Sequence, residues 1–258
     1  MTPGSPRVIE ETSDAREPGR CIGAGLRQIL VMRLFTARQC MADESLPLPL
    51  RAMKARADVQ RASALLKLWK KKLGPAHAAA VARFKAASRH LALLEAPEKA
   101  FRRSTTSDFS PEIEDELAEI ASLLRRCEVD GVVLVASLVE PEDLEKALKK
   151  ARQKAKKRFA DVEDHPDHAN LERLRRTVRA ESALVEAAET HFNGIDTQER
   201  KRLETLELLL DRSLGTGPAG TNSSPSSRKA AVRDVLELGC RIYGLKKAAA
   251  KRPSAGGG

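Results

Sequence analysis

Two short stretches match sequence patterns that are used in metal binding or in cofactor binding. Residues 164–168 read Asp-His-Pro-Asp-His, and carboxylate and imidazole groups are common ligands of zinc. A third ligand at a suitable spacing is missing, and Asp167 is explained as the cap of the helix that follows. Residues 215–220 match the GxGxxG pattern, but they follow a predicted helix, whereas the dinucleotide fingerprint follows a strand. The sequence therefore predicts no catalytic residue, cofactor or metal site, and we expect a protein that is not an enzyme.

Basic residues are concentrated in particular segments. Residues 51–72 hold eight basic side chains against one acid, and residues 142–158 hold eight against three. Residues 112–119, in contrast, hold five acids and no base. Basic segments of this kind repel themselves unless an anion neutralises them, because like charges on neighbouring helical positions are destabilising. The pattern predicts a surface that binds a linear polyanion; the simpler alternative is a basic surface that serves only solubility.

The whole chain is also basic, with 46 Lys and Arg against 36 Asp and Glu and a net charge of +10. Such a charge attracts nucleic acid, anionic membranes or other polyanions. Aromatic residues make up only 3% of the chain, and proteins that bind single strands stack the bases on exposed aromatic rings. Trp69, Phe84 and Phe159 all fall on predicted core positions, which disfavours single-stranded nucleic acid. Binding of a duplex through its backbone, or of an acidic protein, remains an alternative.

The cysteines carry no sign of a metal site or of secretion. Cys21, Cys40, Cys127 and Cys240 lie far apart in the chain and are interpreted as buried thiols in a reducing cytosol. The N-terminal residues contain no signal peptide, and the longest apolar stretch, residues 131–139, is too short to span a bilayer. We therefore expect a cytoplasmic protein that does not enter a membrane, whose oligomeric state the sequence does not indicate.

Apolar residues recur at spacings of three and four in nearly every segment, which is the pattern of helices that bury one face. The chain is predicted to be all-α, with eight helices that begin or end at prolines and glycines. The apolar residues 131–139 are interpreted as a buried helical turn, because no partner strand is found elsewhere. Disordered tails are expected at residues 1–19 and 249–258, and a flexible linker at residues 216–227.

Five segments resemble motifs of one known family, in the same order along the chain. Residues 53–68 resemble its basic helix HxxRKxxKRxRALLRL, and residues 85–94 resemble its helix RDAARRLSxLRD. Residues 148–152 are similar to YRRGRRA, residues 175–179 to a second HxxRKxxK helix, and residues 238–246 to LGxRLYxxK. This order, over residues 19–247, resembles the CHAD domain (conserved-histidine α-helical domain). The family's two histidines fall at Met53 and Glu172 of this chain, and its RD pair falls at Glu95-Ala96.

The resemblance implies a fold and a function for residues 20–248. The fold would be two pseudo-symmetric four-helix bundles, about residues 20–128 and 141–248, with a basic groove between them. The function would be binding of inorganic polyphosphate without catalysis, with targeting to polyphosphate granules as an extension. The residues that match basic or aromatic motif positions are the implied polyphosphate-binding residues: Arg56, Arg61, Lys67, Lys85, Arg89, Lys149, Lys150, Arg152, Arg175, Arg176, Arg179, Arg241, Tyr243 and Lys246.

Overall fold

The computed structural model describes residues 18–70, 74–95, 111–133, 139–191, 197–215 and 225–244. Every regular element in these ranges is helical, which confirms the all-α prediction for this part of the chain. None of these helices is long and apolar enough to cross a membrane. The elements are α1 (Pro18–Ala42), α2 (Leu48–Leu66), the 3-10 helix η1 (Lys67–Trp69), α4 (Pro75–Glu95), α6 (Pro111–Val133), α7 (Pro141–Asp164), α8 (His168–His191), α9 (Thr197–Ser213) and α10 (Pro225–Tyr243).

Most helix ends lie where proline and glycine predicted them. Proline is favoured at the first helical position, since its missing N–H would have no partner there and its φ already suits a helix. Gly74 and Gly215, with φ of 51° and 73°, adopt the left-handed conformation next to helix ends. The predicted cap of α8 is confirmed, because the backbone N–H of Asn170 donates to Asp167 Oδ1 at 2.8 Å. Pro111 and Pro141 open helices as predicted, and Pro75, which was predicted only to end the preceding helix, opens α4.

Some predicted boundaries differ from the structure by a few residues. Helix α1 begins at Pro18, inside the segment predicted as a tail. The predicted linker 216–227 overlaps α10, which begins at Pro225, because proline at the first helical position lets a Ser-rich segment enter a helix. The apolar stretch 131–139 continues α6 as far as Val133. The remaining parts of the tails, of the linker and of this stretch lie outside the described residues.

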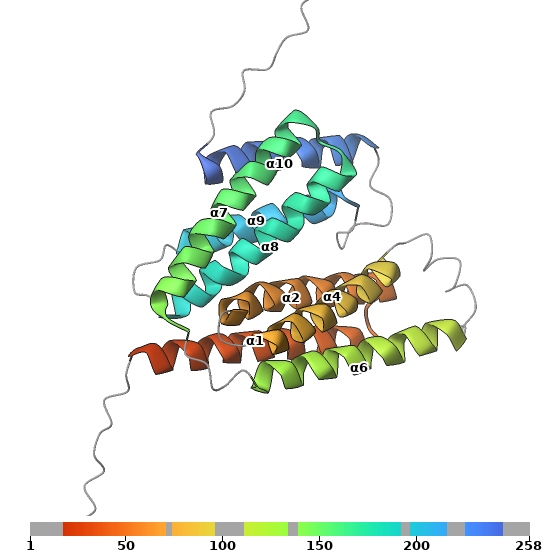
Figure 1. Cartoon of the computed structure of the whole chain (residues 1–258). Coiled ribbons are helices and arrows are strands. Elements are labelled where there is room, and N and C mark those ends of the chain that lie inside the picture. The colour runs from red at the N-terminus through yellow and green to blue at the C-terminus, as the bar shows by residue number, and fades with distance from the viewer. Residues whose placement is uncertain are drawn as a thin grey trace, which may run out of the picture.

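The described helices gather around two hydrophobic clusters. The first contains apolar side chains of α1, α2, η1, α4 and α6, among them Trp69 and Phe84. The second contains side chains of α7, α8, α9 and α10, among them Phe159 and Tyr243. Figure 1 shows α7–α10 stacked over α1, α2, α4 and α6. Helices α7 and α8 contribute to both clusters, because Leu144 and Ala187 pack in the first cluster.

Two contacts position the charged helices relative to this core. Helix α8 packs directly on α2, so the basic residues of both helices meet at their interface. Helix α10 packs on α7 at Gly239, where an added Cβ atom would lie 1.9 Å from a ring carbon of Phe159. Only glycine permits that approach, and it fixes one side of α7 against the second cluster. The opposite side of α7, which carries most of its lysines, faces solvent.

Candidate anion-binding site

Four of the predicted arginines lie at the interface between α2 and α8. Arg56 and Arg61 come from α2, and Arg175 and Arg179 come from α8. Since residues four apart lie on the same helical face, Arg175 and Arg179 both point toward α2 and α9. The side chains of Arg175 and Arg179 are only 2% and 1% exposed. Burial of that depth is rare for arginine unless a carboxylate is paired with it.

Each of the two arginines nearest α4 is held by more than one carboxylate, and some of these come from distant parts of the chain. Arg175 Nη1 lies 3.2 Å from Glu95 Oε1 and 2.9 Å from Asp211 Oδ1, and its Nη2 lies 2.5 Å from Glu172 Oε2. Arg56 contacts Glu95 through one nitrogen and Glu172 at 2.9 Å through the other. Glu95 and Glu172 therefore tie α2, α4 and α8 together.

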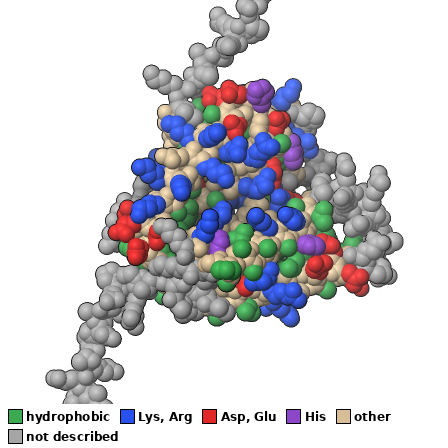
Figure 2. Space-filling model, viewed as in Figure 1, with side chains coloured by type: hydrophobic (Ala, Val, Ile, Leu, Met, Phe, Trp, Pro, Cys, Tyr) green, Lys and Arg blue, Asp and Glu red, His purple; other side chains and the backbone are tan. Residues whose placement is uncertain are grey.

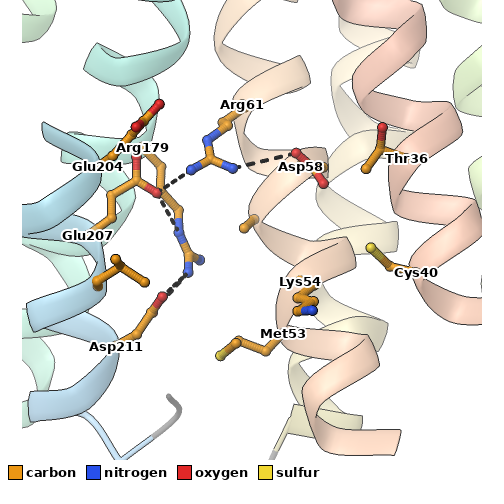
Figure 3. A pocket seen from close by; sticks show the side chains of 12 residues that line it. Thr36, Cys40, Met53, Lys54, Asp58, Arg61, Arg179, Glu204, Glu207 and Asp211 are labelled. Carbon is orange, nitrogen blue, oxygen red and sulfur yellow. Dashed lines mark hydrogen bonds and ion pairs between the residues drawn. The ribbon is translucent and has the colours of Figure 1, made fainter. Parts of the chain in front are cut away.

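The other two arginines are held in the same way beside α9 (Figure 3). Arg61 lies 2.5 Å from Glu207 and 3.5 Å from Asp58. Arg179 donates to Asp211 at 2.9 Å and contacts Glu207 at 3.7 Å. These residues line a pocket of about 430 Å³ between α1, α2, α8 and α9. Because guanidinium and carboxylate groups alternate on its wall, the pocket offers no excess of positive charge.

We call these four arginines, with Asp58, Glu95, Glu172, Glu207 and Asp211, the arginine network. Its four guanidinium groups face five carboxylates, so the network carries no net positive charge when all groups are ionised. Burial opposes the charge of Arg175, but Glu95, Glu172 and Asp211 outweigh it and raise the pKa. Burial lowers the pKa of Arg179 and raises that of Glu207. The network therefore connects helices inside the protein, and carboxylates of the chain itself neutralise its arginines.

Two of the predicted residues, Lys149 and Lys150, are exposed on α7 among four further lysines. Figure 2 shows Lys and Arg side chains gathered over α7 and along the hollow between the upper and lower helices. Lysines are exposed along this helix, and none of them makes an ion pair with another described residue. We call them the lysine surface: Lys146, Lys149, Lys150, Lys154, Lys156 and Lys157.

Three further predicted cations are exposed on η1 and α4. Lys67 follows α2 in η1, and Lys85 and Arg89 lie one turn apart on α4. Loss of water around Lys67, together with repulsion from Lys154 and Lys85, lowers the pKa of its ammonium group. Lys154 on α7 and Lys85 on α4 thus both act on the charge of Lys67. Cations predicted from separate motifs come together here.

The remaining predicted site residues have other surroundings. Arg152 is half-exposed and pairs with Glu199, with Glu181 3.8 Å away. Arg176 is exposed and lies 3.7 Å from Glu172. Arg241 is exposed and lies 2.5 Å from Glu237 on its own helix. Tyr243, in contrast, is buried and donates its hydroxyl to Glu181 at 3.0 Å, which ties α10 to α8. Lys246 lies outside the described residues.

Of the two positions that the resemblance aligns with histidines, Glu172 belongs to the arginine network and Met53 lies beside it. Glu172 contacts Arg56, Arg175 and Arg176, and Met53 lines the neighbouring pocket. Glu95, at the position of the family's RD pair, bridges Arg56 and Arg175. Glu95 and Glu172 thus supply negative charge to these arginines from within the chain.

Sequence reasoning missed two residues beside the exposed lysines. Lys154 belongs to the basic segment 142–158 but to no family motif, and its spacing of four from Lys150 was the signal that places it on α7's exposed face. His77 is buried near Lys67 and Lys70, and no local pattern indicates that contact.

The prediction that Trp69, Phe84 and Phe159 are core residues is confirmed, since none is more than 1% exposed. Among the described residues there is no group of three or more side chains that could hold a metal ion.

Comparison with known proteins finds no matching family model, no similar curated protein and no similar solved structure. The resemblance to the CHAD domain stays a prediction.

Proposed function

We propose that the protein binds inorganic polyphosphate, without catalysis, along the lysine surface of α7 and the exposed cations of η1 and α4. The observation that carries this proposal is the absence of acid partners for the lysines of α7 among the described residues. A chain of phosphates would neutralise these cations and release counterions. The proposal includes the two-bundle arrangement, with the polyanion lying along the seam between the bundles, and targeting to polyphosphate granules.

The same observation limits which predicted residues take part. Arg56, Arg61, Arg175 and Arg179 already have carboxylate partners, and Tyr243 is buried. A polyanion would have to displace those carboxylates and leave them unpaired inside the protein, which is costly. We therefore assign binding to Lys67, Lys85, Arg89, Lys149, Lys150 and Lys154, and assign the arginine network to the joint between the two groups of helices.

Single-stranded nucleic acid is the closest alternative, and the distribution of aromatic rings argues against it. Phe35 is the only aromatic side chain of the described residues that is more than one third exposed, and it lies on α1 beneath Arg38. The binding helices α4 and α7 present no exposed ring among their described side chains. Base stacking, which supplies much of the affinity for single strands, therefore has no platform near the lysine surface.

The test is a salt titration with long-chain polyphosphate on two matched double variants. Lys149→Gln/Lys150→Gln removes an adjacent pair of cations from α7, and Arg125→Gln/Arg126→Gln removes an adjacent exposed pair from α6. The plot of log affinity against log salt should flatten by about 1.4 for the α7 pair, by analogy with roughly 0.7 per phosphate contact in single strands. The α6 pair should leave the slope unchanged.

Two results would overturn the proposal. Equal flattening in both double variants would show that only the overall charge matters. Displacement of bound polyphosphate by single-stranded or duplex DNA at equal phosphate concentration would replace polyphosphate by nucleic acid as the ligand.

A further inference from the structure

The pocket of about 430 Å³ beside the arginine network lies between two helices that face each other. Helices α2 and α9 both pack on α8, and α1 adds Thr36 and Cys40 to the lining. Figure 3 shows α9 on one side of this space and α2 on the other. Small-molecule sites in proteins have volumes of about 300–1,000 Å³, so the pocket has room for a ligand of that kind.

Apolar side chains contribute to both walls of the pocket. Met53 and Ala57 lie one turn apart on the same face of α2, and both line the space. Leu208 lines it from α9 and is 53% exposed. A leucine in that position leaves apolar surface in contact with water, and covering this surface with a hydrocarbon chain would be favourable. We therefore expect a ligand with an apolar body.

The charged side chains of the pocket leave one ammonium group without an ion pair. Every acid of the lining lies 2.5–3.7 Å from a guanidinium nitrogen; the pairs are Asp58 with Arg33, Glu204 with Arg200, Glu207 with Arg61 and Asp211 with Arg179. Lys54 also lines the pocket and is exposed, yet it makes no ion pair with a described residue. Its charge acts on Asp43 only from a longer distance. One cation at the edge of the pocket therefore remains available to a ligand.

We propose that this pocket binds a small organic monoanion with an apolar chain, such as a medium-chain carboxylate. The chain would lie against Met53, Ala57 and Leu208, and the carboxylate would pair with Lys54. Lysine suits this role because its ammonium group is a point charge on a flexible stem. A ligand with further negative charges would meet acids that the arginines already hold and would find no second free cation in the lining. The site is separate from the lysine surface, and the inference does not rest on polyphosphate binding.

Three eight-carbon probes that differ only in their head groups test the charge of the ligand. Calorimetry on the full-length protein should show that octanoate binds more tightly than octanol or octylamine. The difference between octanoate and octanol should be about fivefold, the effect of one exposed ion pair. Lys54→Gln should remove this preference and leave the affinity for octanol unchanged. Lys229→Gln, an exposed substitution on α10, is the control and should keep the preference.

A substitution that fills the pocket tests where the chain lies. Ala57→Leu extends a side chain into the space and should displace about two methylene groups of octanoate, which would weaken binding roughly 15-fold. Ala121→Leu, the same exchange at an exposed position of α6, should leave the affinity unchanged. A circular-dichroism melt of each variant identifies any loss that comes from unfolding.

The methyl group of Met53 supplies a readout from inside the pocket. Met53 lines the space and is only 6% exposed, so binding elsewhere on the surface should not move its NMR signal. The chain has four methionines, few enough for their methyl signals to be followed separately. The Met53 signal should shift as octanoate is added, and it should shift less in Ala57→Leu at the same concentration.

Several results would overturn the inference. Binding of octanol or octylamine as tight as that of octanoate would show that the pocket does not select an anion. Unchanged octanoate binding in Ala57→Leu, or an equal loss in Ala121→Leu, would place the chain elsewhere. A Met53 signal that saturating octanoate leaves unmoved would mean that the ligand does not enter the pocket. If long-chain polyphosphate binds while octanoate does not, this inference fails and the proposed function stands.

Discussion

The arginine network and the lysine surface differ in the source of their counter-charge. Arg175, in the network, is 2% exposed and meets carboxylates from α4, α8 and α9. Lys149 and Lys150, on the lysine surface, are exposed and meet none among the described residues. Both regions contribute to the same basic composition. The number of cations in a segment therefore does not reveal which of them remain available to a ligand.

The two regions also carry opposite energetic consequences. Buried ion pairs lose their solvation, so removing one partner leaves an uncompensated charge inside the protein. Exposed like charges repel one another weakly and are screened by salt. We therefore expect substitutions in the arginine network to destabilise the fold with little effect on binding. Substitutions on the lysine surface should weaken binding with little effect on the fold.

The largest effect is expected from Arg175→Met in the arginine network. The variant removes contacts to Glu95, Glu172 and Asp211 and leaves those carboxylates short of partners. The free energy of unfolding in a urea titration should fall by about 3–5 kcal/mol. Arg176→Met is the control on the neighbouring residue, which is 52% exposed, and should cost less than about 1 kcal/mol. Equal losses would mean that the network does not hold the helices together.

The affinity for polyphosphate can be measured on the same variant, Arg175→Met. At temperatures where Arg175→Met remains folded, its affinity for polyphosphate should match that of the unchanged protein. A loss as large as that of Lys149→Gln/Lys150→Gln would show that the buried arginines do contact the polyanion, and the separation of the two regions would be wrong.

The second effect tests Glu181, a buried acid whose guanidinium neighbour, Arg152, lies 3.8 Å away. Burial raises the pKa of Glu181 to about 7, although the hydroxyl of Tyr243 and the charge of Arg152 oppose the shift. Because the folded-state pKa is higher than the unfolded one, the contribution of Glu181 to stability should be greatest at low pH. It should be lost as the pH rises from the ordinary value of 4.5 to about 7. The total loss should be roughly 3 kcal/mol.

Glu181→Gln should remove this pH dependence, because the amide oxygen can still accept from Tyr243 but cannot ionise. Urea titrations at pH 5 and pH 8 should show the variant and the unchanged protein close together at the lower pH. At the higher pH the variant should be more stable by about 2–3 kcal/mol. Glu145→Gln, an exposed substitution on α7, should change stability by less than about 0.5 kcal/mol at both pH values. A similar pH dependence for Glu181→Gln would contradict the assignment.

Local patterns predicted the helices, whereas contacts between distant residues decide whether each arginine has a carboxylate partner. The start of α7 at Pro141 and the cap at Asp167 are properties of adjacent residues, so one sequence suffices to find them. Arg61, in contrast, is paired with Glu207, 146 residues away. Neither residue carries a local sign of the other. The motif resemblance therefore predicted four available arginines where the fold supplies each with an acid.

Contacts between distant segments also decide the surroundings of Lys154. Lys67 and Lys85 were predicted from motifs, whereas Lys154 acts on Lys67 because α7 contacts η1. Helical periodicity placed Lys154 on an exposed face of α7 but did not show which element lies opposite that face. Which face of α7 lies across from α4 depends on the packing of α7 against α8 and α10.

The smallest effect is expected from Lys154→Gln on α7. Its effect on the free energy of unfolding should be opposite in sign to that of substitutions in the arginine network. Lys154→Gln removes a cation that repels Lys67 and that has no acid partner among the described residues. The free energy of unfolding at low salt should therefore rise by roughly 0.2–0.5 kcal/mol, the size of a like-charge pair on a helix surface. In about 1 M salt, where charges are screened within roughly 3 Å, this gain should vanish. The same variant should bind polyphosphate more weakly, so stability and affinity would change in opposite directions at one residue. A loss of stability at low salt would mean that Lys154 is held by an acid, and the distinction between the two regions would then fail at this lysine.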